Sequence, residues 1–258
     1  MVGSYVKKGV RLGHNDLDIL DLEKVREFFK REKPTVVLDL AAATNMRRCE
    51  EERDHAYSVN AIGTYHVALA TREVGAKLVY VSSGAIFDGT KKGPYTTNDL
   101  PNPVNGYGLS KYLGECAVRS VSDNYLIVRS SWIFGGGPKY EKKFVGLIAK
   151  QLQSKEILAV DDVVGNPTYA KDLVKAIMLA IARKERGIIH FVNAGKTTRF
   201  EVAKFIVEIF ESKAKVRGVP LSYFNPTGNT LHNESLRSSL HLRSWRDALR
   251  EYLNNEWR

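Results

Sequence analysis

The feature that most constrains the fold is an alternation of short apolar runs with longer amphipathic segments. The apolar runs have the length and composition of buried strands; they cover residues 35–40, 77–82, 124–129, 157–160 and 188–192. Helical periodicity fills the intervals, at residues 21–31, 54–74, 107–122, 142–152, 169–183, 200–212 and 245–253. Strands that alternate with helices build a mostly parallel sheet with helices on both faces. The sequence therefore predicts an α/β fold with a doubly wound parallel sheet.

Composition narrows the class of protein further. With 258 residues, of which 43% are hydrophobic, the chain can form one large domain, or a main domain with a smaller lobe. No apolar run approaches the roughly 20 residues that span a bilayer, and residues 1–9 lack the apolar core of a secretory signal. Cys49 and Cys116 are too few for a disulfide framework. We therefore expect a cytoplasmic protein without a membrane partner, in which both cysteines are reduced.

The net charge of +10 favours an anionic ligand, either a nucleotide or a nucleic acid. Lysine and arginine are spread along the whole chain, however, and no DNA- or RNA-binding motif accompanies them. We therefore expect no nucleic-acid partner. The sequence also predicts no metal site.

Small and polar residues follow several of the expected strands. Ligands of open α/β sheets bind outside the carboxyl ends of the strands. The residues at or soon after those ends are Ala41-Ala42-Ala43, Ser82-Ser83 and Ser130 to Trp132, and Asp18-Ile19 comes soon after a further short apolar stretch, Val10-Arg11-Leu12. The alanines could serve tight packing alone, or they could let a flat cofactor approach the backbone, and the two interpretations are compatible. We expect the binding site where these segments converge.

Tyr107 and Lys111 lie four residues apart at the start of an expected helix. Four residues make about one helical turn, so both side chains leave the same face. An ammonium beside a phenol favours the phenolate and lowers the phenol pKa from about 10 toward the working range. Ser83, at the end of the preceding strand, can hydrogen-bond a carbonyl oxygen as it is reduced. The spacing of Tyr107 and Lys111 alone matches many helices by chance, but with Ser83 it suggests carbonyl/alcohol redox chemistry.

Nearly the whole chain, from about Gly3 to Leu253, resembles the extended short-chain dehydrogenase/reductase superfamily and, more narrowly, the dTDP-4-dehydrorhamnose reductase family. The matching segments are Leu17-Asp18-Ile19, Leu40 to Asn45, Val59 to Thr64 (V-N-x-x-G-T), Ser82-Ser83 with Phe87-Asp88-Gly89, Tyr107 with Lys111, Arg129 to Gly135 (R-T-S-W-V-F-G), Gly165 to Thr168 (G-x-P-T), Asn229-Thr230-Leu231 and Trp245 to Leu249. The order and spacing of these segments make the resemblance specific.

The resemblance implies a Rossmann-like fold with NADP or NAD as cofactor, and reduction of a 4-keto sugar nucleotide, most simply dTDP-4-dehydrorhamnose. It implies Ser83, Tyr107 and Lys111 as the catalytic residues. The cofactor would be bound by Gly3, Asp18, Ile19, Ala41, Ala42, Ala43, Tyr107 and Lys111. Ser83 and Trp132 would contact the substrate. A homodimer is compatible with the resemblance, and the positive net charge favours NADP over NAD.

Two domains follow from the same resemblance. Residues 1–135 and 157–185 would form the NAD(P)-binding domain. Residues 136–156 and 186–258 would form a smaller, C-terminal substrate-binding lobe.

The chain departs from the family at its N-terminus and in the pocket. The family opens with a strand and a G-x-x-G-x-x-G loop that seats the cofactor pyrophosphate, whereas only Gly3 of that loop is matched here. The preferred interpretation is a start assigned at an internal methionine, and the alternative is a genuinely shortened chain. Gly84-Ala85 replaces an Asp-Tyr pair, which predicts a wider and less polar sugar pocket. Arg47 stands where relatives often have aspartate, and Pro226-Thr227-Gly228 replaces an Arg-Pro pair.

Two other functions fit the same residues. An epimerase or dehydratase would also use Ser83, Tyr107 and Lys111, although a dehydratase is expected to carry acidic residues where Gly84 and Ala85 stand. A non-catalytic, NADP-binding regulatory subunit, like that of methionine adenosyltransferase, resembles the same family. The altered pair and the unmatched glycine loop favour the regulatory subunit, whereas the intact catalytic residues favour the enzyme.

Overall fold

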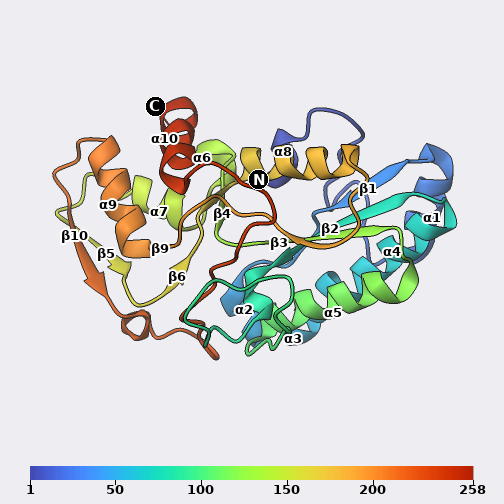
Figure 1. Cartoon of the computed structure of the whole chain (residues 1–258), viewed down its shortest axis with the longest axis horizontal. Helices are drawn as coiled ribbons and strands as arrows, with labels where there is room; N and C mark the ends of the chain where they lie inside the picture. The colour runs from blue at the N-terminus through green and yellow to red at the C-terminus, as the bar shows by residue number, and fades with distance from the viewer. Residues whose placement is uncertain (258) are drawn as a thin grey trace.

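A computed structural model describes residues 1–257. Its central feature is a four-stranded sheet formed by β1 (Val36–Asp39), β2 (Lys77–Ser83), β3 (Tyr125–Ser130) and β8 (Gly187–His190), in the order β1-β2-β3-β8. Every neighbouring pair in this sheet is parallel. The predicted parallel, Rossmann-like sheet is therefore confirmed, and it occupies the right half of Figure 1.

Helices cover both faces of this sheet, because its strands alternate two sets of apolar side chains. Leu78 and Tyr80 pack on one face against α1 (Leu22–Glu32), α4 (Thr64–Glu73) and α5 (Gly106–Val121). On the other face Val79 and Leu126 pack against α8 (Ala170–Ala182). Figure 1 shows α8 on one side of the strands and α4 and α5 on the other.

Side-chain caps fix where the helices near the site begin. Asp21 caps α1, as expected, by accepting a hydrogen bond from the Lys24 amide. Asn105 does the same for α5 through the Gly108 amide, at 2.8 Å, so the helix that carries Tyr107 and Lys111 starts at Gly106. The helical region expected at residues 54–74 is divided into α3 (Arg53–Tyr57), a π-helical turn η2 (Ser58–Gly63) and α4. A short helix that the sequence did not predict, α2 (Met46–Glu51), precedes them and is capped by Asn45.

The left half of Figure 1 contains a second, smaller core. In it β5 (Glu156–Val160) pairs in parallel with β10 (Lys215–Val219). Three helices pack around this pair: α7 (Phe144–Ala149), α9 (Arg199–Ile209) and α10 (Trp245–Glu256). Short connecting elements join the two halves: β4 (Ile133–Phe134) with β7 (Thr168–Tyr169), β6 (Val164–Gly165) with β9 (Thr197–Thr198), and α6 (Gly137–Tyr140).

The strand pairing differs from the boundaries that the sequence suggested. Residues 157–160 were expected in the cofactor domain, but β5 pairs with β10 in the smaller core. The strand after residue 186 was expected in the lobe, but β8 pairs with β3 in the large sheet. Neither apolar run carries a signal for its partner, which tertiary packing alone selects. The division into a cofactor domain and a substrate lobe remains a prediction.

In the described residues 1–257, the first strand is β1, and the chain before it forms a 3-10 turn, η1 (Val2–Tyr5), and α1. Val2 packs into the cluster beneath α8. The Tyr5 hydroxyl donates to the Glu256 carboxylate, at 2.8 Å, and accepts from the Gly136 amide, at 2.6 Å. These contacts fasten the start of the chain to α10 and to the loop before α6. No helix among the described residues has the length and apolar character needed to cross a membrane.

Candidate active site

Ser83 and Tyr107 meet at the carboxyl end of β2. Ser83 is the last residue of that strand and caps the 3-10 turn η3 (Gly84–Ile86) by accepting from the Ala85 amide, at 3.2 Å. The Tyr107 phenol, from the first turn of α5, lies close enough to this hydroxyl for Ser83 to lower the pKa of the phenol. The structure thus brings together two of the three predicted catalytic side chains. We call Ser83, Tyr107 and Lys111 the reaction cluster.

Lys111 lies one turn further along α5 and is 2% exposed. Its ammonium rests on the Tyr80 ring, 4.0 Å from the centroid, and makes no ion pair among residues 1–257. Burial lowers the pKa of Lys111 to about 8, although the charges of Asp39 and Glu115 raise it. A buried cation without a carboxylate partner is suited to accept a hydroxyl-bearing ligand such as a ribose.

The pKa of Tyr107 contradicts the sequence-based expectation. Burial raises it to about 12; the hydrogen bond with Ser83 opposes this rise, and the charge of Glu234 adds to it. Lys111 does not lower the phenol pKa in this structure, because its ammonium faces Tyr80 and the desolvation of Tyr107 dominates. A phenol with a raised pKa keeps its proton at neutral pH, as a proton donor must.

The alanine turn follows β1 and is partly exposed. Asn60, in η2, holds it from both sides: Ala43 donates its amide to the Asn60 side chain, at 2.8 Å, and accepts from it, at 3.0 Å. Asn60 also donates to Ser110 of α5, at 2.8 Å. This asparagine therefore ties the alanine turn to the helix of the reaction cluster. The V-N-x-x-G-T match contained it, but the sequence assigned it no role.

The other expected cofactor residues lie around the same end of β1. Ile19 packs so closely on Gly63 of η2 that a Cβ there would lie 2.5 Å from its side chain, and its carbonyl lies 3.1 Å from the His66 ring. Asp18 is used locally, accepting from the Leu20 amide at 3.0 Å. Gly3 faces Leu40, 3.7 Å from its Cβ position. Together with the small alanines, these residues leave an edge of the sheet along which a dinucleotide can lie.

Trp132 lies at the centre of a second group of residues. Its backbone has φ +42°, a conformation that a large side chain rarely adopts. The indole lies against Gly165, where a Cβ would come within 2.4 Å of the ring. Its N–H donates to Glu234 Oε1, at 3.0 Å, and the Arg199 guanidinium lies over the ring, 5.0 Å from the centroid. We call Trp132, Gly165, Arg199 and Glu234 the indole cluster.

The sequence placed Trp132 in the site but missed Arg199 and Glu234. Neither lies in a recognisable motif, and only tertiary packing brings them to the indole. The Arg199 guanidinium also lies 5.4 Å from the Phe144 ring centroid. Burial lowers the pKa of Arg199, and the Glu234 carboxylate opposes that effect.

The wider pocket expected at Gly84 and Ala85 is not observed. Both residues are buried. A Cβ on Gly84 would lie 3.1 Å from the Glu234 carbonyl oxygen and 3.4 Å from the Leu236 side chain. The chain around residues 234–236 therefore fills the space above Gly84. Asn229, from one of the matching segments, contacts the start of α5, where its carbonyl accepts from the Asn105 side chain at 3.4 Å.

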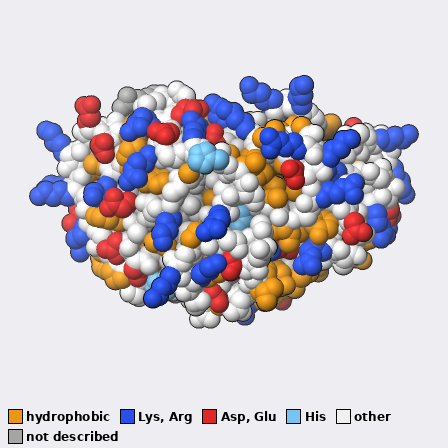
Figure 2. Space-filling view, in the orientation of Figure 1, with side chains coloured by type: hydrophobic (Ala, Val, Ile, Leu, Met, Phe, Trp, Pro, Cys, Tyr) orange, Lys and Arg blue, Asp and Glu red, His pale blue; other side chains and the backbone are white. Residues whose placement is uncertain are grey.

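Charge on the molecule is dispersed. Figure 2 shows Lys and Arg side chains scattered over the visible face, with acidic and apolar side chains between them.

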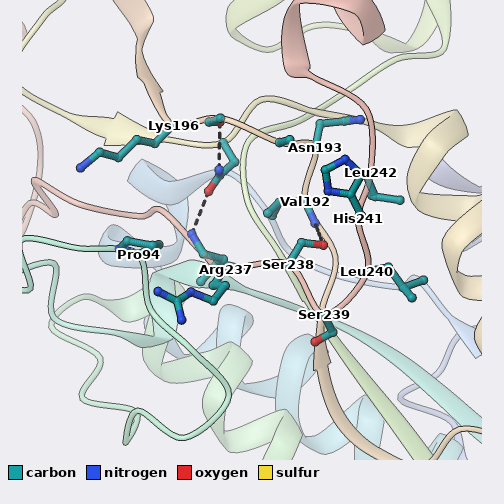
Figure 3. A pocket seen from close by; sticks show the side chains of 14 residues that line it. Pro94, Val192, Asn193, Lys196, Arg237, Ser238, Ser239, Leu240, His241 and Leu242 are labelled. Atoms are coloured by element: carbon teal, nitrogen blue, oxygen red, sulfur yellow. Dashed lines mark hydrogen bonds between the residues drawn. The ribbon is translucent and has the colours of Figure 1, made fainter.

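Next to the segment that carries Glu234 lies a cavity of about 380 Å³ (Figure 3). It is lined by residues 192–196 and 236–242 together with Pro94 and Asn166. Among residues 1–257, no three His, Cys, Asp or Glu side chains are grouped as a metal site would require.

Known proteins are similar to this chain in sequence. The model of the RmlD substrate binding domain family matches residues 5–257. The spore coat polysaccharide biosynthesis protein SpsK of Bacillus subtilis is 34% identical, over 92% of this chain and 85% of that protein. A dTDP-4-dehydrorhamnose reductase of Burkholderia thailandensis is 31% identical, over 93% of this chain and 88% of that enzyme.

Similarity extends to the three-dimensional structure. The crystal structure of dTDP-4-dehydrorhamnose reductase from Bacillus anthracis in complex with NADP has a TM-score of 0.93 and 31% sequence identity, and the match covers 98% of this chain and 95% of that one. Its similar proteins include dTDP-4-dehydrorhamnose reductases, which are enzymes of the extended short-chain dehydrogenase/reductase superfamily. The chain therefore belongs to the RmlD substrate binding domain family.

Proposed function

We propose that this chain reduces the 4-keto group of a dTDP-linked sugar, converting dTDP-4-dehydrorhamnose to dTDP-rhamnose with NADPH. The observation that carries the proposal is that Ser83, at the carboxyl end of β2, and Tyr107, in the first turn of α5, lie close enough for their hydroxyl groups to interact. Relatives named dTDP-4-dehydrorhamnose reductase, one of them in complex with NADP, support both the substrate and the cofactor. NAD is the alternative cofactor.

The chain's own residues would supply the acid and the oxygen contacts. When bound, the reduced nicotinamide supplies the hydride that the carbonyl carbon gains. Tyr107 gives its proton to the carbonyl oxygen, which becomes the hydroxyl of the product. Ser83 donates a hydrogen bond to the same oxygen and stabilises the charge that develops there. The phenol proton is then restored from solvent.

The remaining contacts follow from where each side chain lies. Lys111, a buried ammonium that forms no ion pair with any residue of the described range 1–257, would hold the nicotinamide ribose. Trp132 would pack against the substrate. We assign the rest of the cofactor surface to Gly3, Asp18, Ile19, Ala41, Ala42 and Ala43.

Turnover tests the proposal directly. NADPH oxidation is measured with dTDP-4-dehydrorhamnose for the wild type, for Tyr107→Phe and for Tyr223→Phe, which alters an exposed tyrosine. Loss of a general acid lowers the rate by about 10² to 10⁴, so kcat should fall by that factor in Tyr107→Phe and stay unchanged in Tyr223→Phe. Equal turnover in Tyr107→Phe and the wild type would exclude the mechanism.

Three expectations from the sequence remain predictions: the cytoplasmic location, the homodimer, and the division into a cofactor domain and a substrate lobe.

The regulatory alternative predicts NADPH binding without turnover, and association with a partner enzyme in a pull-down experiment. The proximity of the Ser83 and Tyr107 hydroxyls favours the enzyme, because a regulatory subunit does not need these two groups close together.

A further inference from the structure

The Glu234 carboxylate is nearly buried beside the proposed reaction site. Its residue is 8% exposed. One oxygen, Oε1, accepts from the Trp132 indole N–H at 3.0 Å. The other, Oε2, has no donor among residues 1–257. Oε2 is not among the fully buried atoms that lack a partner, so it is an acceptor that solvent or a ligand can reach.

Glu234 lies close to the reaction cluster. Its backbone carbonyl rests above Gly84, which directly follows Ser83. Its charge acts on the Tyr107 phenol and on the Arg199 guanidinium. A ligand whose carbonyl oxygen contacts Ser83 and Tyr107 therefore lies within reach of this carboxylate.

Backbone hydrogen bonds hold the segment that carries Glu234 in one position. The Glu234 amide donates to the Val164 carbonyl, at 2.8 Å. The Leu236 amide donates to the Asn166 side chain, at 2.8 Å, and the Ser235 carbonyl accepts from the Tyr95 amide, at 2.8 Å. Asn166 also donates to the Gly195 carbonyl, at 3.0 Å, and both residues line the cavity drawn in Figure 3. The carboxylate is thus preorganised before any ligand arrives.

We propose that Glu234 is a specificity-determining residue that accepts, through Oε2, a hydrogen bond from a hydroxyl of the sugar ring. The proposal rests on the proposed function, which places a sugar between Trp132 and Tyr107. An ionised carboxylate is an acceptor only, and hydroxyls are the donors that a sugar ring offers. The diphosphate of the substrate offers no donor, and the carboxylate would repel it.

The test compares a ligand that has a sugar with one that lacks it. The dissociation constants of dTDP-rhamnose and of dTDP are measured by calorimetry for the wild type, Glu234→Gln and Glu208→Gln, an exposed glutamate on α9. Glutamine retains an oxygen for the indole N–H but loses the charged acceptor. Because Glu234→Gln loses a hydrogen bond to a charged group, its affinity for dTDP-rhamnose should fall about 10- to 100-fold. The affinity for dTDP should not change, and Glu208→Gln should bind both ligands like the wild type.

A second background separates recognition of the sugar from support of the indole. In Trp132→Phe no N–H reaches Glu234, so a role limited to holding the indole would make Glu234→Gln silent there. The proposal expects the same loss of dTDP-rhamnose affinity in both backgrounds. It is overturned if the loss disappears in Trp132→Phe, if dTDP and dTDP-rhamnose weaken equally, or if wild-type protein binds the two ligands equally. Absence of NADPH oxidation by a wild-type protein that still prefers dTDP-rhamnose would instead reject the proposed function.

Discussion

The reaction cluster and the indole cluster face the same proposed substrate, but they are assembled in different ways. Ser83 and Tyr107 come from β2 and the next long helix, α5, so two adjacent elements place them. The indole cluster draws on four separate segments, and the hydrogen bond from Trp132 to Glu234 joins residues 102 positions apart. The proposed catalytic residues are therefore placed by elements that follow each other in the chain, whereas the proposed substrate contacts of the indole cluster depend on long-range packing.

Both clusters nevertheless place a cation on an aromatic ring. The Lys111 ammonium lies on the Tyr80 ring, and the Arg199 guanidinium lies on the Trp132 ring. Burial lowers the pKa of each. A cation that rests on a ring, and not in an ion pair, keeps its hydrogen-bond donors available for a ligand.

The largest expected effect concerns the support of the reaction cluster. Arg129 of β3 and Glu115 of α5 form a buried, two-point ion pair, with distances of 2.9 and 2.7 Å and side-chain exposures of 2% and 0%. Arg129→Met leaves the Glu115 carboxylate buried without a partner, so the free energy of unfolding should fall by about 3–5 kcal/mol. Urea denaturation measures this change.

The matched control removes an exposed arginine. Arg217 pairs with Glu156 at 3.2 Å, and both side chains are about half exposed. Arg217→Met should cost at most about 1 kcal/mol. Equal losses in the two variants would show that the ion pair beneath the reaction cluster contributes no more than a surface pair.

The next effect disturbs the indole cluster and leaves the reaction cluster intact. In Gly165→Ala the new Cβ would lie 2.4 Å from the Trp132 ring, so the indole must move. Overpacking of this kind costs about 1–3 kcal/mol. Thermal unfolding and the near-ultraviolet circular dichroism of the tryptophans report the stability and the displacement.

Gly93→Ala is the control for that variant, because no atom lies within 4 Å of its Cβ position and its φ is not in the left-handed region. It should change neither signal. If the substrate affinity of Gly165→Ala stays unchanged despite a displaced indole, the indole cluster does not contact the substrate, and the comparison drawn above fails.

The smallest effect is a pH dependence that separates Lys111 from Tyr107. Burial lowers the pKa of Lys111 to about 8 and raises that of Tyr107 to about 12. The ammonium should therefore be lost above about pH 8, while the phenol keeps its proton. Because kcat/KM reports groups of the free enzyme, it should fall about tenfold per pH unit above pH 8. A profile that stays flat to pH 10 would contradict an essential ammonium.

The contribution of Lys111 to the free energy of unfolding should rise over the pH range in which kcat/KM falls. Between about pH 8 and the ordinary lysine pKa of 10.5, the unfolded chain keeps a proton that folded Lys111 has lost. The unfolded state then binds more protons, so the contribution of Lys111 to the free energy of unfolding rises with pH. Lys111→Met should lack this rise, as urea denaturation at pH 7 and pH 9 would show.

Much of the fold and part of the site could be predicted from the sequence. Strands β2 and β3 and helices α1, α5 and α8 lie where the periodicity put them, because their apolar residues repeat with a clear period. Pairing could not be predicted in the same way: β5 and β8 exchanged sheets relative to the expected boundaries. An apolar run shows that a strand is buried, but it does not show which strand lies beside it.

The same limit explains the errors in the site. A glycine and an alanine after Ser83 suggested empty space, but a small residue is equally a place where another segment can approach, and Glu234 and Leu236 do so at Gly84. The phenol pKa was expected to fall because Lys111 is one helical turn away. Spacing along a helix does not show where a long side chain turns, and this one turns to Tyr80.

By itself, the sequence determined the order of strands and helices and the choice of Ser83, Tyr107 and Lys111, because both depend on residues close together in the chain. Only the tertiary structure decided that Trp132, Arg199 and Glu234 share one wall, and that burial outweighs charge at Tyr107. Contacts between distant segments and the desolvation that they cause arise from packing, and no local pattern of residues records them.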